Sequence, residues 1–158
     1  MKKTTLTLVA QISFQISLVM ALALTSFVSA ATQLWQAPLK VKVPFAFSVN
    51  GRTMPAGEYS ITEQGARHLL VVRNFAEKKA IGVLIQAVPG KQTNANTRLE
   101  FRRYGSQYFL ASLWLAGQTE GMEMQRTDAE RRAAEALKNI AGVPAQPELV
   151  VVNVAATE

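Results

Sequence analysis

The chain has 158 residues, with 17 Lys and Arg, 11 Asp and Glu, one His and no Cys, and its formal net charge is +6. The lack of Cys excludes disulfides, thiol catalysis and thiolate metal sites, and a single His leaves little for a zinc or copper centre. Stability must therefore come from packing, and no cofactor is expected.

The first 30 residues have the pattern of a secretory signal peptide. Lys2 and Lys3 give a positive start, and the apolar stretch that follows reaches its longest uninterrupted run at residues 18–24. The small residues at 28–30 suit signal peptidase, which predicts cleavage after Ala30. The protein is therefore expected in the periplasm or outside the cell.

An uncleaved membrane anchor is the alternative interpretation of this segment. A spanning helix needs about 20 consecutive apolar residues, whereas the run at 18–24 is short and interrupted on its N-terminal side by Gln and Ser. No charged cluster follows the run to stop transfer. We expect cleavage, which leaves 128 residues with a net charge of +4, because Lys2 and Lys3 are removed and every acid is retained. No transmembrane span is expected in the cleaved protein.

The first strand is predicted at residues 40–49, after a lead-in at 31–39. Apolar and mostly polar residues alternate along it, as in an antiparallel sheet with one solvated face. Pro44 has no backbone N–H, so the strand should lie at an edge or bulge there. The apolar positions are Val41, Val43, Phe45, Phe47 and Val49.

Turn signals divide the next part of the chain into further short strands. Asn50-Gly51 suits a tight hairpin turn, because both residues accept positive φ angles. A strand at 58–62 should place Tyr59 and Ile61 on one face. Further strands are predicted at 68–73, 80–88, 97–104 and 108–115, the last two joined by a three-residue connection at 105–107. The spacing predicts a mainly β fold, an antiparallel β-sandwich or barrel-like meander.

One amphipathic helix is predicted at about 127–141, within a single β domain that covers residues 40–158. Thr127 and Glu130 form a capping box. In this motif the Thr hydroxyl accepts a hydrogen bond from the backbone N–H of the Glu, and the Glu carboxylate accepts one from the backbone N–H of the Thr. An apolar run at 149–154 is typical of a strand that either closes the sheet or stays loose. The apolar face of the helix comprises Ala129, Ala133, Ala136, Leu137 and Ile140.

The predicted hairpin at 97–115 mixes basic and aromatic residues. In the cytoplasm such a mixture would suggest single-stranded nucleic acid, but export argues against nucleic acid. The alternation with Leu99 and Phe101 places the arginines on the solvated face, where they are candidate contacts for an envelope polysaccharide, a lipid headgroup or another envelope protein. The candidate residues are Arg98, Arg102, Arg103, Tyr104 and Tyr108.

No catalytic or metal-binding residue is predicted. His68 is the only His and Asp128 is the only Asp. Because Asp128 falls in the capping box at the helix start, no other Asp is present to complete a Ser-His-Asp triad with His68. The acidic stretch from Glu120 to Glu130 lacks the ligand spacing of a calcium loop. Paired carboxylates could hydrolyse a glycoside, but spacing selects no pair among Glu58, Glu63, Glu100, Glu120 and Glu123.

Two segments resemble a group of small exported bacterial proteins of unknown function. They are VPFAFSVNG…MPAGEY at 43–59 and RRYGSQYFL at 102–110, and the helix that opens at Thr127 follows them. The resemblance covers about residues 40–140. It implies export and a β domain with a trailing helix, and it implies no site residues.

These observations predict an exported, non-enzymatic binding or structural module of the cell envelope. Two alternatives stay open: a β-barrel carrier of a small apolar ligand or lipid, and an envelope-acting hydrolase that uses Glu residues. An apolar interior cavity of roughly several hundred Å³ would favour the carrier. A cleft with two facing carboxylates would favour the hydrolase.

Overall fold

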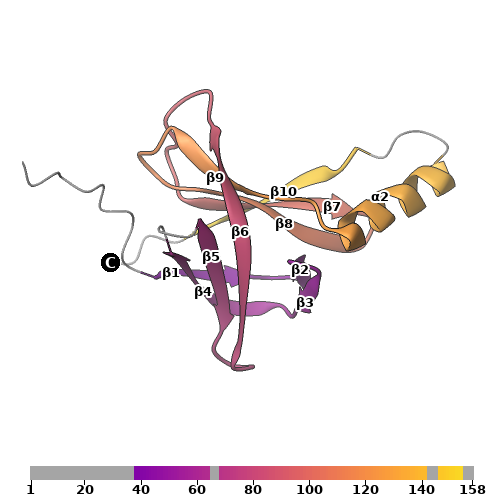
Figure 1. Cartoon of the computed structure of the whole chain (residues 1–158), viewed down its shortest axis with the longest axis horizontal. Coiled ribbons are helices and arrows are strands. Elements are labelled where there is room, and N and C mark those ends of the chain that lie inside the picture. Colours follow the sequence, from indigo (N-terminus) through magenta and orange to yellow (C-terminus); the bar gives the residue numbers. More distant parts are fainter. Residues whose placement is uncertain (1–37, 65–67, 142–145, 155–158) are drawn as a thin grey trace, which may run out of the picture. The chain divides into compact units, whose positions relative to one another are not determined.

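The computed structural model describes residues 38–64, 68–141 and 146–154, and this part of the chain is mainly β (Figure 1). It contains a single helix near the C-terminal end, so the predicted fold class is confirmed. The predicted signal peptide and nearly all of the lead-in lie outside the described residues.

One continuous sheet folds about its longest strand, β6, into two halves. Residues 79–84 of β6 pair with β5 in the first half, and residues 85–89 pair with β9 in the second. The first half has the antiparallel order β1 (Leu39–Val43), β4 (Gly57–Gln64), β5 (Leu69–Asn74) and β6 (Lys79–Pro89). The second half continues with β9 (Glu120–Met124), β8 (Gln107–Trp114), β7 (Arg98–Tyr104) and β10 (Glu148–Asn153).

A short hairpin of β2 (Phe47–Val49) and β3 (Arg52–Met54) joins the second half beside β8. β2 meets β8 through the parallel pair Ser48 and Phe109, which makes the sheet mixed rather than purely antiparallel. The Asn50-Gly51 turn joins the two strands with φ angles of 48° and 74°, so the predicted tight hairpin turn is confirmed.

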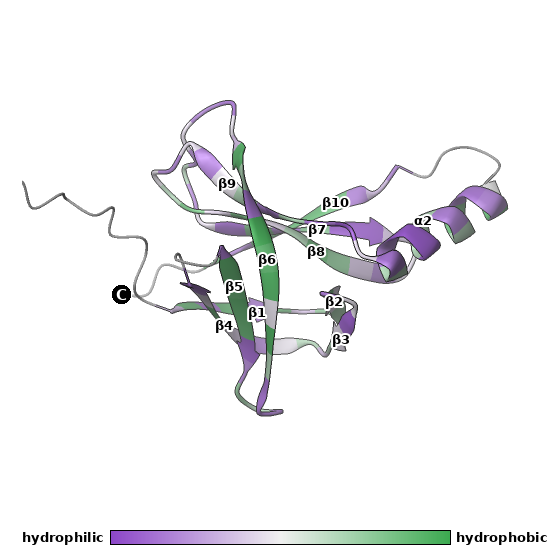
Figure 2. Cartoon of the chain, viewed as in Figure 1, coloured by the Kyte–Doolittle hydropathy of each residue, from purple (hydrophilic) through white to green (hydrophobic). Residues whose placement is uncertain are grey.

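The inner faces of both halves pack on one apolar core. Phe47 connects them, since its ring lies 5.1 Å from the ring of Tyr59 in β4 and 5.3 Å from the ring of Phe101 in β7. The strands carry most of the hydrophobic residues, whereas the helix is largely hydrophilic (Figure 2). The largest buried apolar side chains are Tyr59, Phe101, Met54, Ile61, Leu70, Leu99 and Leu113.

The prediction of one strand over 40–49 was wrong in its continuity. β1 ends at Val43 and pairs with β4, while β2 begins at Phe47 and pairs with β3 and β8, so the chain crosses between the halves at this point. Pro44 cannot donate to a ladder, which favours the break. Phe45 lies in the crossing, where its ring stacks 4.1 Å from that of Tyr108.

Two further elements differ from the prediction. The β7–β8 connection has two residues rather than three, because Tyr104 pairs with Gln107 and Gly105 adopts a φ of 60°. Strand β9 was not predicted, since two Glu and a Gly lower its strand propensity. Gly121 is needed in β9, because a Cβ atom there would lie 2.5 Å from the indole of Trp114.

Helix α2 (Asp128–Ala141) packs on the sheet from its first turn as far as Leu137. Ala129, Ala133 and Leu137 contact Tyr104 and Phe109 of the sheet. The prediction that Ala136 and Ile140 share this buried face was wrong, since both are exposed and Ile140 is 84% accessible. The C-terminal end of α2 extends beyond β7 and β8 (Figure 1), so Ile140 has no part of the sheet to pack on.

Candidate functional site

The five residues predicted as a contact surface lie in three different places. Arg102 and Tyr104 are buried beneath α2, Arg98 lies at the opposite end of β7, and Arg103 and Tyr108 lie near the β7–β8 turn. The expectation of a solvated face was wrong for Arg102, because α2 covers that face of β7. The structure therefore does not gather these residues into one surface.

Arg102 fastens α2 to the sheet. Its Nε lies 2.6 Å from Oε1 of Glu130 in the first turn of α2, and its Nη2 lies 3.5 Å from Oε2 of the same carboxylate. Nη1 donates to Glu123 at 3.1 Å, and Nη2 also donates to the carbonyl oxygen of Met124 at 3.2 Å. The guanidinium thus connects β7, β9 and α2 through charge-assisted hydrogen bonds.

Glu130 has a different role from the one that the capping box predicts. Its backbone N–H donates to Oγ1 of Thr127 at 3.3 Å, as expected, but its buried carboxylate binds Arg102. The hydroxyl of Tyr104 donates to the same carboxylate at 3.4 Å. Burial and the negative charge of Glu130 raise the pKa of Tyr104, so the phenol remains a donor.

Arg98 is held within its own surroundings. Its Nε lies 2.9 Å from Glu100, its Nη1 donates to Asn94 at 2.7 Å, and its guanidinium lies 5.3 Å from the ring centroid of Trp114. With the 89–95 loop, Arg98 and Trp114 line a surface cavity of about 540 Å³. These contacts give Arg98 a structural role at the end of β7.

Arg103 and Tyr108 secure the last strand. Arg103 pairs with Glu148 of β10 at 3.1 Å and donates to the carbonyl of Gly105 at 2.8 Å. Its guanidinium lies 5.4 Å from the ring centroid of Tyr108. Because these contacts are internal, the pair links β10 to the β7–β8 hairpin.

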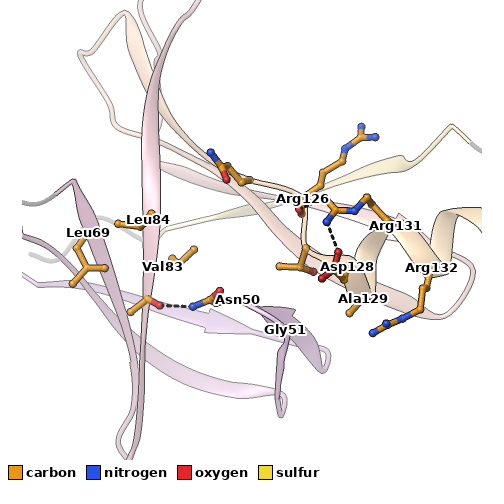
Figure 3. Close-up of a pocket in the computed structure, with 13 residues that line it drawn as sticks. Asn50, Gly51, Leu69, Val83, Leu84, Arg126, Asp128, Ala129, Arg131 and Arg132 are labelled. Carbon is orange, nitrogen blue, oxygen red and sulfur yellow. Dashed lines mark hydrogen bonds and ion pairs between the residues drawn. The ribbon is translucent and has the colours of Figure 1, made fainter.

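A second set of arginines, which the sequence did not single out, lines a groove between β6 and the start of α2 (Figure 3). The groove has a volume of about 650 Å³. Arg126, Arg131 and Arg132 lie on the helix side, and Leu69 and Leu84 lie on the sheet side. Three arginines close together around a helix start could have indicated a basic surface. The sequence does not show, however, that β6 faces them.

The groove is positively charged beside an apolar wall. Asp128 is the one carboxylate among its lining residues, so three arginines leave a net charge of +2. Arg131 pairs with Asp128, and Arg126 lies 3.8 Å from Glu130, which Arg102 already neutralises. Arg132 has no ion pair in the described part of the chain. Opposite these charges, Leu84 is 66% exposed.

The end of the groove is fixed by a turn. Nδ2 of Asn50 donates to the carbonyl oxygen of Gly82 in β6 at 3.0 Å (Figure 3). The bond attaches the β2–β3 turn to β6, so Gly51 lies at a defined position beside the groove. The sheet side and the turn therefore form a supported surface.

Comparison with protein-family models, curated proteins and solved structures gives no match. The resemblance to small exported bacterial proteins accordingly stays a prediction. Among residues 38–64, 68–141 and 146–154, no helix has the length and apolar character to cross a bilayer. The same residues contain no cluster of three or more His, Asp or Glu that could hold a metal ion.

None of the candidate hydrolytic carboxylates lines the two surface cavities described above or a third beside β4 and β5. These three cavities contain one acidic residue between them, Asp128. Burial alone would raise the pKa of Glu100, but donors on Ser112, Trp114 and Arg98 outweigh it and lower that pKa. His68, in turn, is an exposed turn residue with a φ of 48°.

We expect the Arg102→Met substitution to destabilise the fold strongly. It would leave the buried carboxylate of Glu130 without its cation, a loss of about 3–5 kcal/mol in the free energy of unfolding. Urea denaturation measures this loss. An Arg102→Met/Glu130→Met double variant should recover most of it, because two apolar side chains leave no buried charge.

The matched control is Arg131→Met, which removes the exposed pair with Asp128. It should cost less than about 1 kcal/mol. Equal losses for Arg102→Met and Arg131→Met would contradict a clamping role for Arg102.

Proposed function

We propose that this protein is an exported, non-enzymatic binding module of the cell envelope. Its groove between β6 and α2 holds an acidic, partly apolar segment of another envelope protein. The observation that carries the proposal is the arginine side of the groove, Arg126, Arg131 and Arg132, set against the exposed Leu84.

The contiguous apolar core supports a binding module over a carrier. The side chains between the two halves of the sheet form one contiguous apolar cluster, with ring contacts from Phe47 to both halves. The grooves of the described residues open at the surface and have mixed polar and apolar linings. An extended partner can enter such a groove without unfolding the core.

The arrangement of carboxylates supports a non-enzymatic role. Glu123 and Glu130 bind Arg102, and Glu100 binds Arg98 and Ser112. These carboxylates are engaged in internal ion pairs and hydrogen bonds, which would have to break before the carboxylates could act on a substrate. The remaining carboxylate at the groove, Asp128, is exposed and paired with Arg131.

The chemistry of the groove favours a peptide segment among the envelope partners. Arginine binds carboxylates through two parallel hydrogen bonds, and Arg132 is available for such a bond. Leu69 and Leu84 offer contact to an aliphatic side chain beside that charge. The lining residues include no aromatic ring on which a sugar could stack, which counts against a polysaccharide.

A peptide titration tests the groove. The probe is an eight-residue peptide of alternating Glu and Leu, followed by amide chemical shifts of the labelled protein. Shifts should concentrate at 126–132 and at Leu84. Arg132→Gln should weaken binding about tenfold, since one charge-assisted contact of roughly 1.4 kcal/mol is lost.

The control for Arg132→Gln is Lys138→Gln, which removes the same charge from α2 outside the groove. It should leave the affinity unchanged. Equal weakening by both variants, or equal binding of a Lys-Leu peptide, would contradict a specific groove. Binding to vesicles of anionic phospholipid with no peptide binding would replace the protein partner by a lipid surface.

Export has its own test. Expressed from the full coding sequence in a bacterial host, the protein should be recovered from the periplasm or medium. Its mass should be that of a chain whose first residue is Ala31. Leu22→Glu should block export, because a charge interrupts the apolar run. An uncleaved chain that begins at Met1, in the cytoplasm or the membrane fraction, would overturn the proposed location.

A further inference from the structure

We propose that two copies of this protein associate through antiparallel pairing of their β10 strands. The inference does not depend on the peptide groove, because no residue of β10 lines that groove. It rests on the composition of β10, on the direction of its backbone groups and on the contrast with the other sheet edges.

β10 is an edge strand with an apolar outer face. Among the residues that the structure describes, it pairs with β7 alone. Val150 and Val152 pack against the core, whereas Leu149 and Val151 are 55% and 47% exposed. The strand therefore presents apolar side chains at an edge that can accept another strand.

The backbone of β10 offers hydrogen-bonding groups away from the sheet. The N–H of Val154 donates to the carbonyl oxygen of Thr97 at 2.9 Å, next to the register pair of Asn153 and Arg98. In an antiparallel pair, residues alternate between bonding the partner and facing away. Val152 and Val150 thus face β7, and the N–H and C=O groups of Leu149, Val151 and Asn153 face outward.

The other edges of the sheet carry features that block strand addition. β1 holds Lys40 and Lys42 between Pro38 and Pro44, and β3 has only three residues, one of them Arg52. Lysine, proline and short length are the usual means of protecting an edge. β10 has none of these means over its six residues.

A two-fold register centred on Val151 makes the strand complementary to itself. Val151 then faces Val151 of the second copy, and Leu149 faces its Asn153, so every outward N–H meets an outward carbonyl. Glu148 lies opposite Val154, which keeps the two acidic residues apart. A register centred on Val150 would require an N–H from residue 147, which is proline.

The charges near the strand also favour a second copy as the occupant. Glu148 is the one charged residue of β10 and pairs with Arg103 of β7, so the strand presents no unpaired charge to a second copy. Leu149 and Val151 of both copies would then form one apolar stripe on the outer face of a continuous sheet. Self-pairing needs no complementary charge from an outside protein.

Sedimentation velocity of the protein from its full coding sequence tests the proposal. The sedimentation coefficient should rise from that of a monomer to that of a dimer as concentration increases. Val151→Lys should shift the equilibrium to monomer, because two lysines would face each other at the centre. Phe75→Lys, at a residue that is 63% exposed on the β5–β6 turn, should leave the dimer intact.

A single introduced cysteine provides a test that does not rely on a disruptive variant. The chain has no Cys, so Val151→Cys has no internal thiol to react with. Facing residues in this register have Cα atoms about 5.5 Å apart, which is within the range for a disulfide. Mild oxidation should give a covalent dimer for Val151→Cys and none for Phe75→Cys.

Three results would overturn the proposal. One is a monomer at every concentration. Another is a dimer that Val151→Lys leaves unchanged, and the third is an open series of larger species, which a two-fold contact cannot produce.

Discussion

The position of α2 depends on the buried ion pair between Arg102 and Glu130. The helix is short of apolar contacts, since Ala133 is the one buried apolar side chain among its described residues and Ile140 is exposed. A charge pair taken out of water is stable only when its geometry is good and its remaining hydrogen-bonding groups are satisfied. Here Glu123, the carbonyl of Met124 and the hydroxyl of Tyr104 supply those contacts. The pair therefore fixes where the helix lies more than it adds to overall stability.

The groove follows from that placement. Glu130 in the first turn of α2 is held at β7, so the neighbouring Arg126, Arg131 and Arg132 come to face β6. The position of β6 is fixed by its pairing with β5 in one half of the sheet and with β9 in the other. A surface assembled in this way is charged on its helix side and aliphatic on its strand side. This division supports the proposed recognition of an acidic, partly apolar peptide.

Much of the β architecture could be predicted because period-2 alternation reports which side chains face a core. Tyr59 and Ile61 were placed correctly by that pattern, and the Asn50-Gly51 turn by its φ requirements. Arg102 could not be placed, since a cation on an alternating strand looks solvated until a distant helix covers it. β9 was missed because its pairing with β6 and β8 overrides a composition of Glu, Gly and Met. The groove could not be predicted either, because its two sides are far apart in the sequence.

Hydrogen exchange of the α2 amides in a Glu130→Gln variant tests the clamping role of the ion pair most directly. The variant keeps the shape of the side chain and removes its charge, and Glu135→Gln on the exposed face of the same helix is the control. Exchange should accelerate throughout 128–141 in Glu130→Gln, while amides of β4 and β5 and the whole of Glu135→Gln keep the protection of the unaltered protein. Unchanged protection of α2 in Glu130→Gln would contradict the account.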